Sequence, residues 1–203
     1  MLKQDADSDE ALVKRAGGGD QIAATVLVER HTRMIYAASY RMLGSKHAAE
    51  DAVQETFLRL WRHATKWKPQ GAKFETWLYR VAMNICLDHL RKAKRVAPEE
   101  AAPGGMDAQA DGADRQDQAI FLRERRFAID EALERLPERQ KLAITLCHFQ
   151  ELSNIEAAEI MEISVDALES LLARGRRGLK ESLAPMREHL TGKMDDEQSI
   201  NIN

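Results

Sequence analysis

The stretch 153–180 constrains the fold more than any other part of the chain, because it reads as two helices around a tight turn. Ser153 and Glu156 have the spacing of a capping box, which starts a helix. Ser164 ends the turn and can cap a second helix, predicted at 165–180 with a basic second half. This plan is typical of a helix-turn-helix that places one helix in the DNA major groove. The alternative is an antiparallel helix pair with a solvated basic end.

Composition places the whole chain in the all-α class. Aromatic residues make up 5% of the 203 residues, β-branched runs are scarce, and Ala, Leu, Glu and Arg dominate. Cys86 and Cys147 stand far apart in apolar helical patterns, which indicates buried, reduced thiols. We find no signal peptide and no apolar run long enough for membrane insertion, so we expect a cytoplasmic protein.

The net charge of −3 conceals a gradient along the chain. Residues 1–95 hold 17 basic and 11 acidic side chains, whereas residues 96–118 hold one and six. This acidic segment is rich in Ala, Gly, Pro and Asp and lacks apolar periodicity, so we predict a flexible linker. The expected organisation is a first domain at 1–95, the linker at 96–118, a second domain at 119–190 and a disordered tail at 191–203.

A helix predicted at 46–64 has two different faces. Apolar residues recur at helical spacing on one face and should pack into the core. The neighbouring surface combines a Trp and a Leu with polar acceptors, a mixture suited to a protein partner. The alternative is a solvated face with Trp61 half tucked into its own domain. The residues of this surface are Asp51, Gln54, Glu55, Leu58 and Trp61.

The segment 74–92 is predicted to be one helix or two joined end to end. Asn84 places an amide among apolar neighbours, and Trp77 and Tyr79 are interleaved with cations. Basic residues with aromatics and a lone amide suit single-stranded nucleic acid. In the alternative, Trp77 belongs to the core, and Asn84 breaks the helix and caps the second of the two. Both interpretations remain open at this point.

The sequence contains no arrangement that predicts catalysis. Six histidines are scattered, no Cys/His metal spacing occurs and no glycine-rich phosphate loop is present. Cys147 and His148 are adjacent on one predicted helix, where successive side chains do not face each other. We therefore expect neither an enzyme, a metal nor a cofactor.

The order of these parts resembles the extracytoplasmic-function (group IV) sigma factors, the small two-domain specificity subunits of bacterial RNA polymerase. Residues 49–62 (AEDAVQETFLRLWR) are similar to region 2.2, residues 74–92 to regions 2.3 and 2.4, and residues 133–146 and 151–179 to region 4. The resemblance implies an all-α fold of two small domains, a region 2-like helical bundle and a region 4-like helix-turn-helix, joined by the flexible linker.

The resemblance also implies three binding surfaces. The protein-partner surface described above would bind the core polymerase. Asn84 and its neighbours would capture a flipped base of the −10 element, with the −10 set Arg80, Asn84, Asp88, Arg91, Lys92, Lys94 and Arg95. The second helix of the helix-turn-helix would enter the −35 major groove, with the −35 set Ser164, Glu169, Ser170, Arg174, Arg176, Arg177 and Lys180.

The function that the resemblance implies is an alternative sigma factor of the stress-response type. Its partners would be the β′ and β subunits of core polymerase, promoter DNA and an anti-sigma factor. Glu169 departs from the family's pattern, since cations are common near the start of the recognition helix. A glutamate can accept from a cytosine amino group, but it repels phosphates. The alternative is a sigma-like decoy that sequesters an anti-sigma factor without binding DNA. Such a decoy would have no need for the cations at 91–95 and 174–180.

Overall fold

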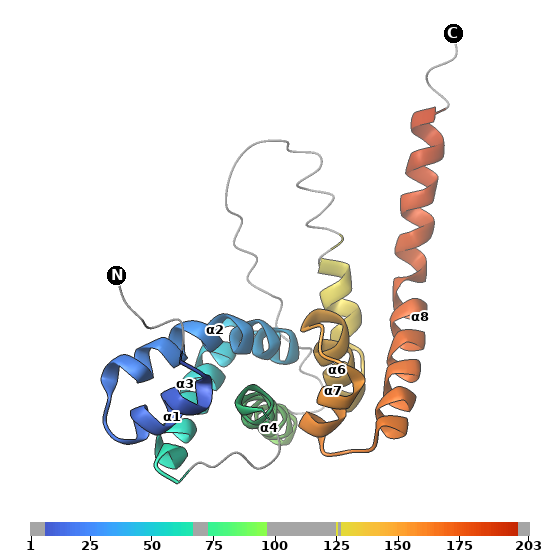
Figure 1. The fold of residues 1–203 in the computed structure, drawn as a ribbon. Helices are drawn as coiled ribbons and strands as arrows, with labels where there is room; N and C mark the ends of the chain where they lie inside the picture. The colour runs from blue at the N-terminus through green and yellow to red at the C-terminus, as the bar shows by residue number, and fades with distance from the viewer. Residues whose placement is uncertain (1–6, 67–72, 97–124, 126, 199–203) are drawn as a thin grey trace.

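The computed structural model describes residues 7–66, 73–96, 125 and 127–198, with only the backbone of Val96 and of residues 186–198. Within these ranges every regular element is a helix, which confirms the all-α prediction (Figure 1). Apart from Val96, the predicted linker lies outside the described residues. The elements are α1 (Asp9–Gly17), α2 (Gln21–Leu43), α3 (Lys46–Ala64), α4 (Phe74–Val96), a helical segment at 127–134, α6 (Glu138–Ile144), the π-helical turn η2 (Thr145–Phe149), α7 (Asn154–Met161) and α8 (Val165–Gln198).

The first three helices begin at side-chain caps. Ser8, Asp20 and Ser45 each accept a hydrogen bond from a backbone N–H in the first turn of the helix that they precede. Gly44 ends α2 in the left-handed conformation, at φ 67°, and its N–H donates to the carbonyl of Tyr40. These local interactions fix where each helix starts and stops.

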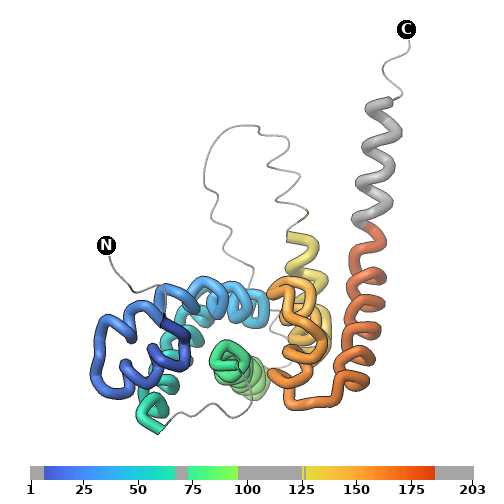
Figure 2. The backbone as a smooth tube through the Cα atoms, viewed as in Figure 1, coloured from blue at the N-terminus to red at the C-terminus, as the bar shows by residue number. Residues whose placement is uncertain are grey.

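Helices α1 to α4 pack around a common apolar centre. Leu27 and Ile35 of α2, Leu60 of α3 and Leu78 of α4 are all fully buried. Each of these four helices contacts the other three. Figure 2 shows α4 between helices α1 to α3 and the helices of the second half.

Helix α8 packs closely against α6 in the second half. Gly175 permits this approach, because a Cβ atom there would lie 3.0 Å from Cγ1 of Ile144. Pro137 lies at the N-cap of α6, where its ψ of 139° is extended. After Ile144, α6 changes to the wider π-helical turn η2.

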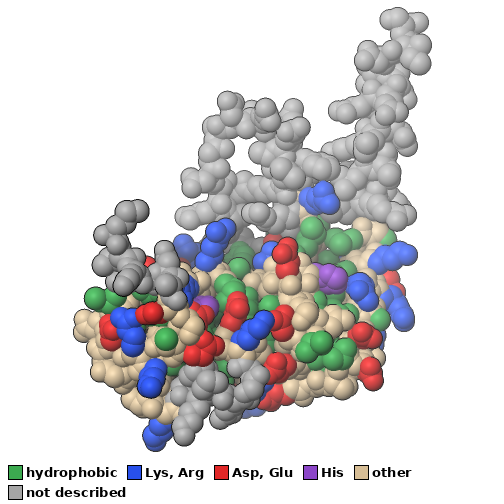
Figure 3. Space-filling view, viewed as in Figure 1, with side chains coloured by type: hydrophobic (Ala, Val, Ile, Leu, Met, Phe, Trp, Pro, Cys, Tyr) green, Lys and Arg blue, Asp and Glu red, His purple; other side chains and the backbone are tan. Residues whose placement is uncertain are grey.

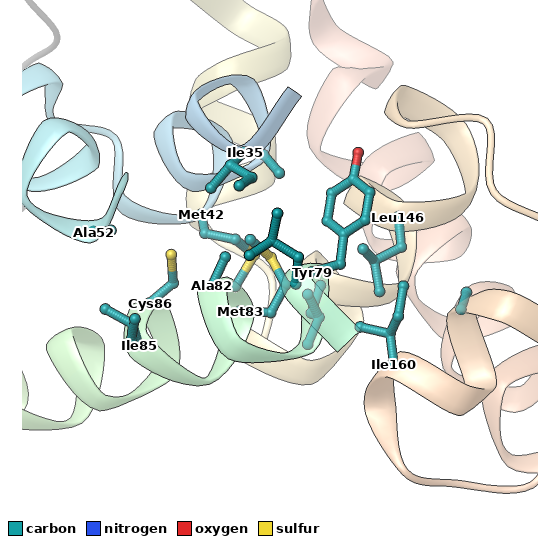
Figure 4. Close-up of a cluster of buried hydrophobic side chains, with 14 of the residues drawn as sticks. Ile35, Met42, Ala52, Tyr79, Ala82, Met83, Ile85, Cys86, Leu146 and Ile160 are labelled. Atoms are coloured by element: carbon teal, nitrogen blue, oxygen red, sulfur yellow. The ribbon is translucent and has the colours of Figure 1, made fainter. Parts of the chain in front are cut away.

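The two halves share one hydrophobic core across α4. Tyr79 of α4 lies near Leu146 of η2 and Ile160 of α7, and all three belong to the same buried cluster (Figure 4). Tyr79 is only 1% exposed, although the sequence interleaves it with cations. The second half is therefore packed on the helix that carries the −10 set.

Two helices differ from their predicted extents. Helix α4 is a single helix that passes Asn84 without interruption, so of the two alternatives left open, the one with a helix break at Asn84 is wrong. Good helix formers on both sides of Asn84 continue the backbone hydrogen bonding through it. Helix α8 extends past the predicted end at Lys180 to Gln198, into the segment expected to be a tail.

Candidate protein and nucleic-acid interfaces

The face of α3 assigned to a protein partner is open to solvent. Asp51 and Gln54 are exposed, Glu55 is partly buried, and Leu58 is 49% exposed. An exposed leucine beside polar acceptors provides apolar contact area and orienting hydrogen bonds together. The structure thus brings these four predicted residues onto one accessible surface.

This face of α3 forms one wall of a groove whose other wall is α4. Asp88 and Lys92, which the resemblance assigns to −10 DNA, lie beside the residues assigned to the protein partner. Arg59 and His89 also line the groove and were not singled out from the sequence. The position of Arg59, four residues after Glu55, is the signal that could have found it. The groove has a volume of about 340 Å³ and is lined by Asp51, Gln54, Glu55, Leu58, Arg59, Ile85, Asp88, His89 and Lys92.

The carboxylates of the groove are paired within their own helices. Nε of Arg59 donates to Oε1 of Glu55 at 2.9 Å, and this bond lowers the pKa of Glu55 below its ordinary value. On α4, Nη1 of Arg91 donates to Oδ1 of Asp88 at 3.2 Å. Asp51 lies 3.1 Å from Nδ1 of His47. The groove therefore presents balanced charge rather than a strongly acidic wall.

Trp61 is partly buried and contributes to its own domain. Its ring stacks on Phe57 with 6.1 Å between the centroids, and it packs against the core cluster. Trp61 does not line the groove. The position of Trp61 therefore matches the alternative in which its side chain is partly buried in its own domain. Leu58 is the more accessible apolar residue of the surface.

The −10 set follows α4 along much of its length. Asn84 is exposed on the continuous helix, and so are Arg91, Lys92, Lys94 and Arg95 near its end. Exposed cations in the last turns can contact phosphates, and an exposed amide can hydrogen-bond a base edge. Because the helix continues through Asn84, its side chain is presented from a rigid element.

Two members of the −10 set contact the second half of the chain instead of solvent alone. Nη2 of Arg80 donates to the carbonyl of Glu159 at 3.0 Å, and Nη1 lies 3.2 Å from Oε1 of Glu162. Nζ of Lys94 lies 2.6 Å from Oε1 of Glu138. These contacts join residues that are far apart in the sequence, so spacing could not indicate them.

The helix-turn-helix has the local structure that its sequence predicts. Ser153 and Glu156 form the capping box at the start of α7, with both reciprocal hydrogen bonds present. Glu162 ends α7 in the left-handed conformation at φ 53°. Oγ of Ser164 accepts from the N–H of Ala167 at 3.2 Å and caps α8. Helices α7 and α8 are therefore held in the expected order around a tight turn.

All members of the −35 set are exposed. They lie at the start of α8 and along its following turns, and Nε of Arg174 donates back to the carbonyl of Ser170 at 3.1 Å. In Figure 3, Lys and Arg side chains alternate with Asp and Glu over the visible face rather than gathering in one patch. The exposed residues are Ser164, Glu169, Ser170, Arg174, Arg176, Arg177 and Lys180.

Asn154 is a neighbour of Glu169 that the sequence did not indicate. Its Nδ2 donates to Oε1 of Glu169 at 3.4 Å, and its Oδ1 lies 3.8 Å from Sγ of Cys147. Asn154 is the first residue of α7, so this hydrogen bond links the two helices of the motif. The carboxylate of Glu169 thus has a hydrogen-bond donor on the neighbouring helix of the motif.

Two other kinds of site have no candidates in the described part of the chain. None of the described helices is both long and apolar enough to cross a membrane. Across the described residues, His, Cys, Asp and Glu side chains form no group of three or more that could hold a metal ion.

Family models match both halves of the chain. The sigma-70 region 2 model matches residues 27–96, and the sigma-70 region 4 model matches residues 126–179. These ranges contain α3 and α4 in the first half and the helix-turn-helix in the second.

Named relatives extend the match over most of the chain. ECF RNA polymerase sigma factor SigW of Bacillus subtilis is 35% identical over 178 residues, which cover 84% of this chain and 94% of that protein. ECF RNA polymerase sigma factor SigE of Mycolicibacterium smegmatis is 34% identical over 170 residues, covering 82% of this chain and 65% of that protein. The solved structure of CnrH in complex with the cytosolic domain of CnrY matches with a TM-score of 0.65 and 25% identity, covering 88% of this chain and 99% of CnrH.

Proposed function

Because the chain belongs to the extracytoplasmic-function RNA polymerase sigma factors, we propose that it binds core polymerase through the α3–α4 groove and directs it to −10 and −35 promoter elements. The protein is a transcription initiation factor, and its own role is binding rather than catalysis. We place it in the cytoplasm, where its polymerase and DNA partners are.

The groove between α3 and α4 is the observation that best supports binding to core polymerase. Its exposed leucine, Leu58, can be buried by a partner, while Asp51 and Gln54 remain available as hydrogen-bond acceptors around it. Burial of a central apolar side chain inside a polar rim is how protein interfaces gain affinity. The coiled coil of the β′ subunit has the elongated shape that such a groove accommodates.

Promoter recognition is divided between α4 and α8. On α4, Asn84 is the residue proposed to read an unstacked −10 base, and the cations at 91–95 are proposed to contact the phosphates of the melted strand. On α8, the exposed first turns are proposed to enter the −35 major groove, with Arg174 and Arg177 near the backbone. Core binding brings both halves to the DNA, so neither half must bind strongly by itself.

Regulation by an anti-sigma factor is part of this proposal. CnrH, whose structure this chain resembles, was solved with the cytosolic domain of CnrY. A partner that covers the α3–α4 groove would exclude core polymerase from the same residues. A decoy that only sequesters an anti-sigma factor would use this surface as well, but it would not need the exposed cations of α4 and α8.

Two measurements on the full chain test the proposal. Core polymerase is first captured on the tagged protein, and run-off transcription is then measured on a library of promoters with varied −10 and −35 sequences. A sigma factor retains core and produces promoter-dependent transcripts. Core retention without any transcript would support the decoy, and failure to retain core would overturn the proposal.

A further inference from the structure

Asp166 lies in the first turn of α8 and is not a member of the −35 set. Its side chain is exposed. Among the described residues, no hydrogen bond or ion pair engages its carboxylate, whereas the carboxylate of Glu169 accepts from Asn154. Asp166 therefore offers unoccupied acceptor oxygens in the part of α8 that the proposed function places in the −35 major groove.

Helix geometry decides which residues of α8 point away from the protein. Leu168 and Leu172 are buried, so they mark the side of α8 that packs on the second half. Successive residues of an α-helix are rotated by about 100°. Asp166 and Ser170, two residues before and two after Leu168, therefore lie on the opposite, outward side. Figure 1 shows α6 and α7 on one side of α8, which leaves the other side open.

Glu169 lies on the flank of α8 rather than on its outward side. It follows Leu168 by one residue, a rotation of about 100° from the buried side. This flank borders α7, where Nδ2 of Asn154 lies 3.4 Å from Oε1 of Glu169. The two carboxylates in the first turns of α8 therefore differ in direction: Glu169 faces the neighbouring helix, and Asp166 faces outward.

The outward side of α8 changes from acidic to basic along its length. Arg177 follows Asp166 by about three full helical turns, so both residues lie on this side. In a helix-turn-helix, the N-terminal residues of the second helix contact base edges, and cations contact the phosphates. Asp166 thus lies at the end of α8 that reads bases, while Arg177 can offset the repulsion between a carboxylate and the DNA backbone.

We propose that Asp166 is a specificity-determining residue for the −35 element, and that its carboxylate accepts a hydrogen bond from the N4 amino group of a cytosine. This inference rests on the proposed function, since it requires α8 to enter the −35 major groove. It assigns base reading to Asp166 and leaves Glu169 with an effect on affinity alone.

The major-groove edges of the bases explain why a carboxylate selects cytosine. An ionised carboxylate only accepts hydrogen bonds. Cytosine presents an amino donor, whereas guanine presents two acceptors, thymine an acceptor and a methyl group, and adenine a donor beside the N7 acceptor. Guanine and thymine would leave the carboxylate desolvated and unpaired, and N7 of adenine would repel it. One good base contact corresponds to a preference of about fivefold or more.

A purely structural role for Asp166 makes a different prediction. A carboxylate in the first turn also interacts favourably with the partial positive charge at the N-terminus of a helix. Loss of that interaction would destabilise α8 and weaken binding to every −35 sequence alike. A changed base preference at a single position is therefore the result that separates base reading from helix stabilisation.

Holoenzyme binding to a library that contains every single-base substitution of the −35 element tests the proposal. The wild type should prefer cytosine at one position, on either strand, by about fivefold or more. Asp166→Ala should abolish this preference. Asp166→Asn should shift it towards adenine, because an amide can pair with both N6 and N7 of adenine.

Glu169→Gln is the matched control, because it removes the same charge from the flank of α8. It should tighten binding to every sequence and leave each base preference unchanged. Urea unfolding shows whether each variant is folded at the assay temperature. Asp166→Asn, which removes the charge with little change in shape, replaces Asp166→Ala if the alanine variant is unstable.

The outcomes separate this inference from the proposed function. If the wild type distinguishes −35 sequences but the Asp166 variants keep its base preferences or weaken binding uniformly, only this inference is overturned. The same conclusion follows if Glu169→Gln changes the same cytosine preference. If the wild-type holoenzyme ignores the −35 sequence altogether, the proposed −35 recognition fails and this inference fails with it.

Discussion

The hydroxyl of Tyr79 donates a hydrogen bond of 2.8 Å to Oε1 of Gln150, a residue 71 positions later in the chain. Tyr79 lies on α4 and Gln150 ends the π-helical turn, so this bond joins the two halves directly. It is surrounded by buried apolar side chains, where an unpaired hydroxyl would be costly. Tyr79 is therefore an interface residue, and it is unavailable for stacking on a nucleic-acid base in this arrangement.

Replacing Tyr79 by Phe should lower the free energy of unfolding by about 1 kcal/mol, because one buried hydrogen bond is lost while the ring remains. The measurement is urea denaturation at neutral pH. Tyr36→Phe is the control, since the Tyr36 hydroxyl has no hydrogen bond among the described residues and its ring stacks on Tyr40. Equal effects of the two substitutions would contradict a contribution from the bond to Gln150.

Lys141→Met should stabilise the protein at neutral pH by about 1 kcal/mol or more, because it removes the desolvation cost of a buried ammonium group. Burial lowers the pKa of Lys141 in the folded state, and Glu134 and Asp130 offset only part of that effect. The unfolded chain then binds the proton more tightly. Stability should rise as the pH increases through the lowered pKa towards the ordinary value of 10.5.

Urea unfolding at neutral and alkaline pH checks both parts of this prediction. The gain from Lys141→Met should shrink as the pH approaches 10.5, where the unfolded lysine also loses its proton. Lys14→Met, at an exposed lysine of α1, should have little effect at any pH. A destabilised Lys141→Met variant at neutral pH would show that the ammonium group is compensated in the folded chain.

Leu58→Ser should weaken binding to core polymerase by about 1–2 kcal/mol, since Leu58 is the accessible apolar residue of the α3–α4 groove. Ile22→Ser is a matched control, because Ile22 is 56% exposed on α2 and does not line the groove. Neither change should alter stability. Affinity measured by titration of labelled polymerase distinguishes them, and equal affinities would remove the groove from the core-binding site.

Trp61→Ala is the less selective test of the same interface. We expect it to reduce core binding by about 2 kcal/mol or more if the indole is a buried anchor in the complex. Because Trp61 stacks on Phe57, the substitution should also lower the unfolding free energy. Affinity must therefore be compared at a temperature where the variant is fully folded.

Glu169→Lys separates two roles for the acidic residue on α8. If Glu169 only repels phosphates, the lysine should tighten holoenzyme binding at every −35 sequence and steepen its salt dependence by about one phosphate contact. If Glu169 accepts from a cytosine amino group, one base preference worth about 1–3 kcal/mol should relax or switch. We expect the first result, and a loss at one base position alone would contradict it.

Asn154→Ala provides the companion measurement. Asn154 donates to Glu169, so its removal should change DNA binding only if the orientation of that carboxylate matters. Both variants are to be measured on a −35 base library at two salt concentrations. A base-specific effect of Asn154→Ala that disappears in the Glu169→Lys background would establish that the two residues act together.

The sequence by itself determined the local structure. Ser153 and Glu156 cap α7, Ser164 caps α8 and Gly44 ends α2, as their positions predict. Each of these interactions joins residues within about one helical turn, so the residues involved and their spacing are sufficient to identify it. The apolar periodicity of α3 predicted its buried face for the same reason, since helix geometry fixes which positions share a side.

Only the tertiary structure decided which surfaces meet. The sequence left Trp77 open between core and nucleic-acid binding, left Asn84 open between base reading and a helix break, and grouped Tyr79 with the cations as a nucleic-acid residue. The fold buries Tyr79, partly buries Trp77 and exposes Asn84. The fold also pairs Arg80 with Glu162. The residue pattern of neither segment indicates that the other will be its partner. Long-range packing selects one partner among many compatible surfaces, and that selection depends on the shapes and charges of both halves together. The capped starts of α7 and α8 could therefore be read from the chain, whereas the end of α8 and the pairing of α4 with the second half could not.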